Sequence, residues 1–201
     1  MIEIKNIQHS KPYEMFYYFY EKAIGANQDN IEAIAVSSFN STSGEVDSRY
    51  VNLKYIDNEN WIFFTNYNST KATQFLEHNQ ISVLLYWSKI NIQIRIKAKI
   101  MKLDRVLNIE HFNVRSKEKN ALAISSKQSK TIESYEKVIQ NYDVALKNID
   151  KQNSCPEYWG GFKFIPYNFE FWEGHESRVN KRINYNLDRN KNIWIKTFLQ
   201  P

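Results

Sequence analysis

The chain has 201 residues, 42% of them apolar, which is enough for one domain with a sizeable hydrophobic core. Its 27 basic and 22 acidic residues are mixed along the sequence, so the net charge of +5 favours a small anionic ligand and argues against nucleic acid, which would need a clustered basic stripe. The single cysteine, Cys155, excludes an internal disulfide and argues against structural zinc. The sequence contains neither a signal peptide pattern nor an apolar run long enough to span a bilayer. We therefore expect a cytoplasmic protein that binds no membrane.

The first part of the chain predicts a helix followed by strands. Pro12 opens a possible helix over residues 12–24, although its many aromatic residues leave a strand as the alternative. Five later segments are rich in β-branched and aromatic residues, which is typical of strands. These segments are residues 31–39, 48–56, 60–66, 81–87 and 90–103.

A short helix is predicted between the third and fourth of these strands, over residues 69–79. Ser69 is a candidate N-cap, and Ala72, Phe75 and Leu76 form an apolar face. The start of this helix is also a candidate anion site, because free backbone N–H groups, a hydroxyl and Lys71 converge there. The alternative is a capped helix with a solvated lysine.

The second half predicts helices and then a return to strands. In INIQIRIKAKI, isoleucines alternate with polar residues, which places Gln93, Arg95 and Lys97 on one face of a strand. From residue 104 to about 150 the pattern is helical. The final strands are expected at residues 158–166, 168–173, 181–188 and 192–199. Because these strands follow one another at hairpin distance, we expect a mostly antiparallel sheet closed on itself, with helices outside.

Signatures of the common enzyme classes are missing from the sequence. There is no Gly-rich phosphate loop, HExxH, CxxC or GxSxG motif, and the four histidines are scattered, so no metal is expected. Arg49 and Lys54 are five positions apart and point to opposite faces of a regular strand. They can serve one ligand only if the strand bends or the ligand lies across its edge.

Five segments, in this order, carry a resemblance: SRYVNLKYIDNENWIFFTNYNSTKA, IQIRIKAKI, SSKQS, YWGGFKFIPYNFEFWEGHESRVNKRINY and the terminal LQP. Together they resemble the pyridoxamine 5′-phosphate oxidase family over about residues 30–201. The resemblance implies a mainly β protein with flanking helices, an antiparallel FMN-binding split β-barrel that forms a homodimer with FMN at the subunit interface. The single domain, 1–201, would then comprise an N-terminal helical segment, 1–28, and C-terminal dimerisation and active-site strands, 155–201.

The resemblance also implies which residues bind FMN. Arg49 and Lys71 would face its phosphate, with Thr70 in place of the family's usual arginine, while Gln93 and Gln128 would meet the polar edge of the ring. The full set of implied FMN-binding residues is Arg49, Tyr50, Val51, Asn52, Leu53, Lys54, Phe64, Thr65, Thr70, Lys71, Gln93, Gln128, Ser129, Trp172 and Arg182.

The substrate side departs further from the family pattern. The family's substrate-phosphate cluster corresponds to Lys54, His111, Arg115 and Lys119, of which the second and fourth are changed, although both types can still hold a phosphate. The family's RLH triplet, whose Arg and His border the substrate ring, appears as RVN. Arg178 and Asn180 are therefore the implied catalytic residues, and they also belong to the implied substrate site.

Three functional hypotheses follow. The first is an FMN-dependent oxidase of pyridoxamine or pyridoxine 5′-phosphate, which passes hydride to the flavin and yields pyridoxal 5′-phosphate and hydrogen peroxide after reoxidation by oxygen. The second is the same dimer acting on another small anionic or aromatic substrate of secondary metabolism, since fold and cofactor do not fix the reaction. The third is a non-catalytic flavin- or pyridoxal phosphate-binding protein.

Overall fold

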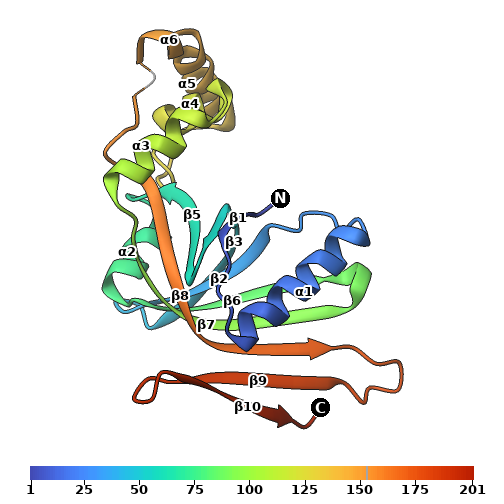
Figure 1. The fold of residues 1–201 in the computed structure, drawn as a ribbon. Helices are drawn as coiled ribbons and strands as arrows, with labels where there is room; N and C mark the ends of the chain where they lie inside the picture. Colours follow the sequence, from blue (N-terminus) through green and yellow to red (C-terminus); the bar gives the residue numbers. More distant parts are fainter. Residues whose placement is uncertain (153) are drawn as a thin grey trace.

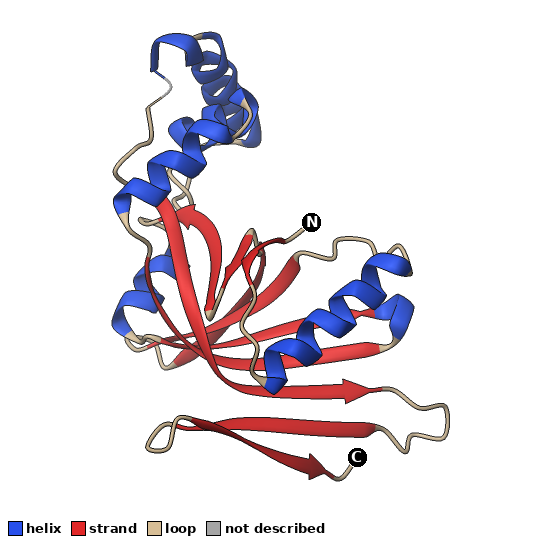
Figure 2. Ribbon diagram, viewed as in Figure 1, coloured by secondary structure: helices blue, strands red, loops and turns tan. Residues whose placement is uncertain are grey.

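The strands of the chain form a single rolled sheet with helices at its end and inside its curve (Figures 1 and 2). The computed structural model describes residues 1–152 and 154–201. Its strands are β1 (Glu3–Asn6), β2 (Ala33–Asn40), β3 (Glu45–Asn52), β4 (Tyr55–Asp57), β5 (Asn60–Asn66), β6 (Gln80–Trp87), β7 (Ile92–Lys102), β8 (Trp159–Glu173), β9 (Lys181–Asp188) and β10 (Ile193–Leu199). Its helices are α1 (Lys11–Gly25), α2 (Thr70–Glu77), the 3₁₀ turn η1 (Ser88–Ile90), α3 (Arg105–Val114), α4 (Lys117–Ser125), α5 (Tyr135–Lys147) and α6 (Ile149–Gln152).

The sheet is antiparallel, as predicted, except for one short parallel pair at its edge. The strand order is β1-β4-β5-β8-β7-β6-β2-β3, with β9 joined to β8 and β10 to β9. The expected N-terminal helical segment, 1–28, therefore also contains a strand, β1, which pairs in parallel with β4. Four residues without clear alternation give no strand signal on their own, so sequence reasoning missed it.

Strand β8 holds the two parts of the sheet together. Its first half pairs with β5 and its second half with β9, while β7 pairs with it from Phe162 to Glu173. The sequence predicts two strands here, separated near Pro166, but the structure has one. A register shift opposite Lys97 and Ala98 leaves Tyr167 as an extra residue, and proline is tolerated beside such a bulge. In Figure 1 this strand (orange) runs from the helical end of the molecule to the β9–β10 hairpin.

Helix α1 fills the inside of the curved sheet. Its buried face includes Tyr13, Phe16 and Tyr20, which recur at helical spacing. Phe16 is fully buried and its ring centre lies 4.5 Å from that of Trp61. The helical alternative for residues 12–24 is thus correct, because the aromatic residues belong to the helix stripe that faces the core.

The short crossing helix is α2, and its buried face differs from the predicted one. Ala72 and Phe75 are buried as expected, but Leu76 is 55% exposed and Gln74 is buried instead. The Gln74 side chain accepts hydrogen bonds from Ser38 Oγ (2.6 Å) and from Arg49, and donates one to a carboxylate on β3. A polar residue can occupy this buried position because its hydrogen-bonding groups are satisfied.

Gly160 is required where β8 begins, and its replacement gives a first prediction. A Cβ atom there would lie 2.3 Å from Tyr67 Oη and 2.4 Å from Asn108 Nδ2. Gly160→Ala should therefore lower the free energy of unfolding by about 3 kcal/mol, the upper range for overpacked sites. Gly25→Ala is the control, since nothing lies within 4 Å of its added Cβ. Urea unfolding of both variants checks the prediction, and equal midpoints for the two would contradict it.

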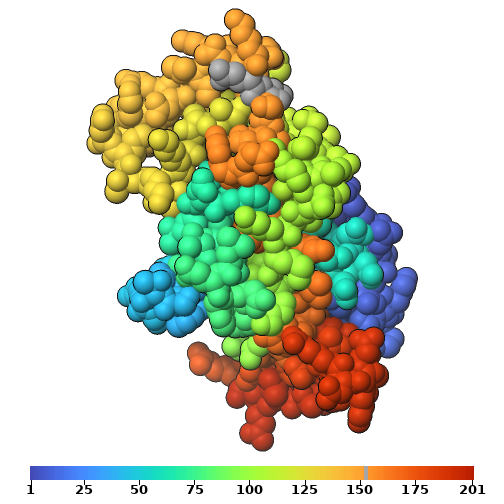
Figure 3. All heavy atoms as spheres, turned by 90° about the vertical axis from the view of Figure 1, so that its left-hand side faces the viewer, coloured from blue at the N-terminus to red at the C-terminus, as the bar shows by residue number. Residues whose placement is uncertain are grey.

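The helices α3 to α6 form a separate layer at one end of the sheet, and the β9–β10 hairpin lies at the opposite end (Figure 3). Among the described residues, no helix has the length and apolar character needed to cross a membrane. The candidate site described below lies where this helical layer meets β4 and β5.

Candidate active site

A cavity of about 300 Å³ brings together most of the cofactor and substrate residues predicted from the sequence. It lies between the β3–β4 bend, β5, the start of α2 and the α3–α4 region. Its lining consists of Tyr50, Val51, Asn52, Lys54, Phe64, Thr65, Lys71, His111, Arg115, Lys119, Gln128 and Trp159. A neighbouring hollow of about 200 Å³ shares Phe64, Thr65, Arg115, Lys119, Gln128 and Trp159 with it.

The chain bends between β3 and β4, as a shared ligand for Arg49 and Lys54 would require. Strand β3 pairs with β2, whereas β4 pairs with β5, so the chain changes partner at residues 53–54. Leu53 is fully buried at the bend, and the Lys54 backbone N–H donates to Ile62 O at 2.8 Å. Lys54 therefore lines the cavity, whereas the buried Leu53 side chain does not.

Lys71 forms the positively charged pole of the cavity. Its Nζ donates to Thr65 Oγ1 at 3.1 Å and to Ser69 Oγ at 3.3 Å. Burial, together with the charge of Arg49, lowers the Lys71 pKa to about 8. None of the ion pairs found among the described residues includes Lys71. A half-buried cation without a carboxylate partner suits a bound anion.

Arg49 lies near Lys71, and its guanidinium forms hydrogen bonds to other side chains of the chain. Its Nη1 donates to Ser38 Oγ at 2.6 Å and its Nη2 to Gln74 Oε1 at 3.1 Å, and burial lowers its pKa. Arg49 does not line the cavity, so it contributes charge at a short distance. Thr70, the first residue of α2, is exposed and is likewise outside the lining.

Gln128 closes the cavity from the loop between α4 and α5. Its Oε1 accepts from Thr65 Oγ1 at 3.1 Å and from the Asn66 backbone N–H at 3.4 Å. These bonds occupy the carbonyl end of the amide and leave the amide N–H groups for a ligand. Ser129 adopts a left-handed conformation, φ 69°, which turns the loop back toward α5.

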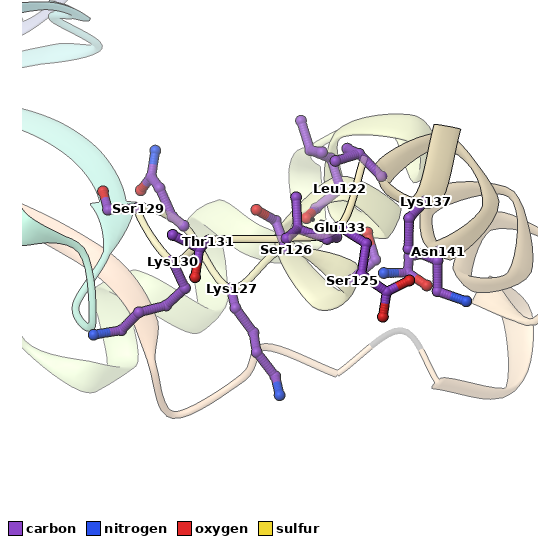
Figure 4. A pocket seen from close by; sticks show the side chains of 13 residues that line it. Leu122, Ser125, Ser126, Lys127, Ser129, Lys130, Thr131, Glu133, Lys137 and Asn141 are labelled. Carbon is purple, nitrogen blue, oxygen red and sulfur yellow. Dashed lines mark hydrogen bonds between the residues drawn. The ribbon is translucent and has the colours of Figure 1, made fainter. Parts of the chain in front are cut away.

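A larger hollow of about 650 Å³ lies on the outer side of this loop (Figure 4). Side chains of α4, the loop and α5 surround it, among them Ser126, Lys130 and Lys137. Ser129 lines this outer hollow rather than the inner cavity, while Gln128 lines both. The loop is therefore the wall between the two spaces.

A stack of aromatic rings forms the second wall of the inner cavity. Phe64 lies nearly parallel to His111, with ring centres 3.7 Å apart, and to Trp159 at 5.4 Å. The Arg115 guanidinium lies over Trp159, 4.4 Å from its ring centre. Sequence reasoning missed Trp159. A tryptophan at the start of an apolar strand is typical of a core residue. The only sequence signal for a site residue here was the YWGGF segment.

A group of cations surrounds a neutral imidazole at this wall. Arg115 Nη1 is buried and has no hydrogen-bond partner among the described residues, while its Nη2 donates to Lys119 O at 2.9 Å. Burial, and then the charges of Arg115 and Lys54, lower the His111 pKa to about 4. His111 is therefore neutral at physiological pH, and the positive charge comes from the lysines and the arginine.

Three predicted flavin contacts lie elsewhere, side by side on one face of the sheet. Gln93 on β7 is opposite Trp172 on β8, which in turn is opposite Arg182 on β9. Arg182 donates to Glu170 Oε1 at 2.7 and 2.9 Å and to Gln200 O at 2.8 Å. Within one chain these residues do not line the cavity.

The predicted catalytic pair occupies the turn between β8 and β9. Arg178 is left-handed, φ 62°, and its N–H donates to His175 O at 2.9 Å. Asn180 Oδ1 accepts from the His175 backbone N–H at 3.0 Å, so this side chain closes the turn. Neither residue lines the cavity of its own chain, and their catalytic roles stay predictions.

The rolled antiparallel sheet with flanking helices, and a cavity with a lysine pole and an aromatic wall, define a protein of the split-barrel class. Two family models match the chain: pyridoxamine 5′-phosphate oxidase over residues 21–146, and the pyridoxine 5′-phosphate oxidase C-terminal dimerisation region over residues 159–201. The chain therefore belongs to the pyridoxamine 5′-phosphate oxidase family. Members of this family bind FMN, and the chain is an oxidoreductase of this FMN-dependent type.

Individual relatives support the assignment over nearly the whole chain. The pyridoxine/pyridoxamine 5′-phosphate oxidase 1 of Hydrogenovibrio crunogenus is 32% identical over 191 residues, covering 94% of this chain and 88% of that protein. The corresponding oxidase of Coxiella burnetii is 33% identical over 176 residues, covering 88% and 89%.

Solved structures confirm the split-barrel fold predicted from the sequence. PhzG from Burkholderia lata 383, in complex with tetrahydrophenazine-1-carboxylic acid, is 27% identical with a TM-score of 0.89, covering 96% of this chain and 93% of that one. A pyridoxamine 5′-phosphate oxidase-related, FMN binding protein from Nostoc punctiforme shares the fold, with a TM-score of 0.76 at 12% identity, covering 95% and 98%.

Proposed function

We propose that the chain binds FMN and oxidises a small anionic substrate, with pyridoxamine or pyridoxine 5′-phosphate as the leading candidate. The observation that carries this proposal is the pole at Lys71, a half-buried cation beside Arg49 that lacks a carboxylate partner. A phosphate dianion suits a lysine ammonium in the cavity wall with a hydroxyl beside it, and the Arg49 charge behind the wall adds to the attraction. Curated relatives with this activity match most of the chain, which supports the same choice.

The residues of the cavity would divide the work between cofactor and substrate. Lys71 and Thr65 would hold the FMN phosphate, with Ser69 orienting the Lys71 ammonium from beneath, and the Gln128 amide N–H groups would donate to the polar edge of the ring. When bound, FMN supplies the chemistry by accepting hydride from the substrate and passing electrons to oxygen.

The substrate itself would be positioned by the cations of the aromatic wall. Lys54, Arg115 and Lys119 would bind the substrate's anionic group, and His111 would supply a neutral hydrogen bond. The protein would contribute by orientation, because holding the reacting carbon against the acceptor ring lowers the barrier to hydride transfer.

The predicted residues that lie outside the cavity of their own chain would contribute to the site of the partner subunit in a homodimer. The C-terminal region, 159–201, matches a dimerisation region and contains Trp172, Arg178, Asn180 and Arg182. We expect these residues of one subunit, together with Gln93, to complete the cavity of the other. A two-subunit site accounts for their distance from Lys71 within one chain. A cytoplasmic location stays a prediction that rests on the single cysteine.

A different substrate is the alternative, supported by a specific observation. A structural relative was crystallised with a tricyclic carboxylic acid, and His111, Lys119 and Asn180 all depart from the family pattern around the substrate. The cations of the cavity would accept a carboxylate as well as a phosphate. The third reading, a flavin-binding protein without turnover, would keep the cofactor residues and lose only the hydride transfer.

The decisive experiment is anaerobic mixing of the yellow holoprotein with pyridoxamine 5′-phosphate, followed by the flavin absorbance. We expect the absorbance to bleach, and to return on admission of oxygen with one peroxide per turnover. Pyridoxamine without the phosphate is the matched control and should reduce the flavin far more slowly. Bleaching only by a reduced aromatic carboxylate would move the assignment to the alternative substrate. Flavin that none of these compounds reduces would contradict the oxidase function.

A further inference from the structure

Tyr55, which sequence reasoning did not single out, contacts the substrate side of the cavity through His111. Its hydroxyl oxygen lies 2.7 Å from His111 Nδ1. The Tyr55 ring stands perpendicular to His111, with centres 5.3 Å apart, and perpendicular to Phe64 at 6.1 Å. His111 is thus fixed on two sides, by a hydrogen bond from β4 and by stacking on β5.

The surroundings keep both members of this pair neutral. The cations that face His111 come from four elements: Lys5 on β1, Lys54 in the bend, Arg115 at the end of α3 and Lys119 on α4. With burial they hold the imidazole pKa far below physiological pH, while burial and then Glu3 raise the pKa of the Tyr55 hydroxyl.

A neutral pair of this kind has two arrangements of its protons. Either the tyrosine donates to Nδ1 and the imidazole carries its own proton on Nε2, or Nδ1–H donates to the tyrosine and Nε2 is a lone pair. A phenol is a stronger acid than a neutral imidazole N–H, so the first arrangement is the stronger hydrogen bond. In it, Nε2–H is the one polar group of the ring left for a ligand.

We infer that Tyr55 is a positioning residue that donates to His111 Nδ1 and thereby presents Nε2–H to the anionic group of the substrate, a phosphate or a carboxylate. The inference rests on the proposed function in that the substrate is an anion. It explains how a histidine can serve in a cluster of cations, because a neutral donor adds a hydrogen bond without adding repulsion. In the ligand-free protein His111 is neutral at physiological pH, so the donor is present before the anion binds.

The first test determines which ring nitrogen of His111 carries the proton. Nitrogen-15 NMR of the histidine-labelled holoprotein should show His111 as the Nε2–H tautomer, and Tyr55→Phe should turn it into a mixture of tautomers. A wild-type signal from the Nδ1–H form would overturn the inference. This readout does not depend on turnover, so it separates a failure of the inference from a failure of the proposed oxidase function.

The second test measures how strongly the variant protein binds an anionic ligand. Tyr55→Phe should weaken binding of pyridoxal 5′-phosphate and of phenazine-1-carboxylate by about three- to tenfold, less than the loss of a whole hydrogen bond to a charged group, because part of the His111 population still carries Nε2–H, with FMN content unchanged. The probe with the larger loss identifies whether phosphate or carboxylate meets His111. Tyr135→Phe, a hydroxyl deletion on the exposed face of α5, is the control and should change neither affinity.

A double-mutant cycle excludes a general structural effect. In a His111→Ala background, Tyr55→Phe should produce no further loss of affinity for either probe, because its only route to the ligand has been removed. Additive losses in the double variant, or unchanged affinity for both probes in Tyr55→Phe alone, would overturn the inference.

Discussion

Lys71→Ala is expected to weaken FMN binding by roughly ten- to a hundredfold, the value of one charge-assisted hydrogen bond to a phosphate. The Lys71 ammonium lies between the hydroxyls of Thr65 and Ser69, where a phosphate oxygen would replace neutral partners with a charged one. Quenching of flavin fluorescence on titration of the FMN-free protein measures the affinity. Lys147→Ala, at the exposed end of α5, is the control and should bind FMN as the unchanged protein does.

The same lysine predicts a pH dependence of FMN affinity. Burial and Arg49 hold its pKa at about 8 in the absence of a ligand. Above this pH the free protein has lost the proton, and binding a phosphate must restore it. The affinity should therefore be level between about pH 7 and 8, where the FMN phosphate is a dianion, and fall above pH 8, approaching tenfold per pH unit. Lys71→Ala should show no such fall, and a flat profile for the unchanged protein would contradict the role given to this residue.

Alternation along the strands predicts much of the fold, because burial of one face leaves a two-residue period in the sequence. In β7 the isoleucines 92, 94 and 96 are buried while Arg95 and Lys97 face outward, as INIQIRIKAKI predicts. The same reasoning fails at α2, where Gln74 is buried and Leu76 exposed. Hydropathy cannot anticipate that Ser38 and Arg49 satisfy a buried amide from a different part of the chain.

Most residues that line the cavity were named from the sequence, but their arrangement was not. The bend at Leu53 that gives Lys54 access to the cavity arises from a change of strand partner, which depends on contacts with residues 32 and 62. The neutrality of His111 likewise arises from cations on four separate elements. Neither follows from local sequence, because both depend on segments that meet only in the folded chain.

Arg115→Ala should raise the KM for the anionic substrate about a hundredfold and leave FMN content unchanged, since a guanidinium can form two charge-assisted hydrogen bonds to one anion. Arg115 Nη1 is buried without a partner among the described residues, and stacking over Trp159 fixes the direction of the guanidinium plane. Binding an anion would satisfy this donor, whose burial otherwise costs free energy.

Two further variants distinguish charge from geometry at this position. Arg115→Lys should recover only part of the affinity, because an ammonium keeps the charge but loses both the planar fork and the stacking on Trp159. Lys22→Ala removes another cation–ring contact, of Lys22 over Tyr18 at 4.5 Å, outside both the cavity and the dimerisation region, and should leave the KM unchanged. Steady-state kinetics with pyridoxamine 5′-phosphate measures all three. Equal KM values for Arg115→Ala and Lys22→Ala would show that the substrate anion binds elsewhere, whereas a large effect of Arg115→Ala alone places it against the aromatic wall, within reach of His111.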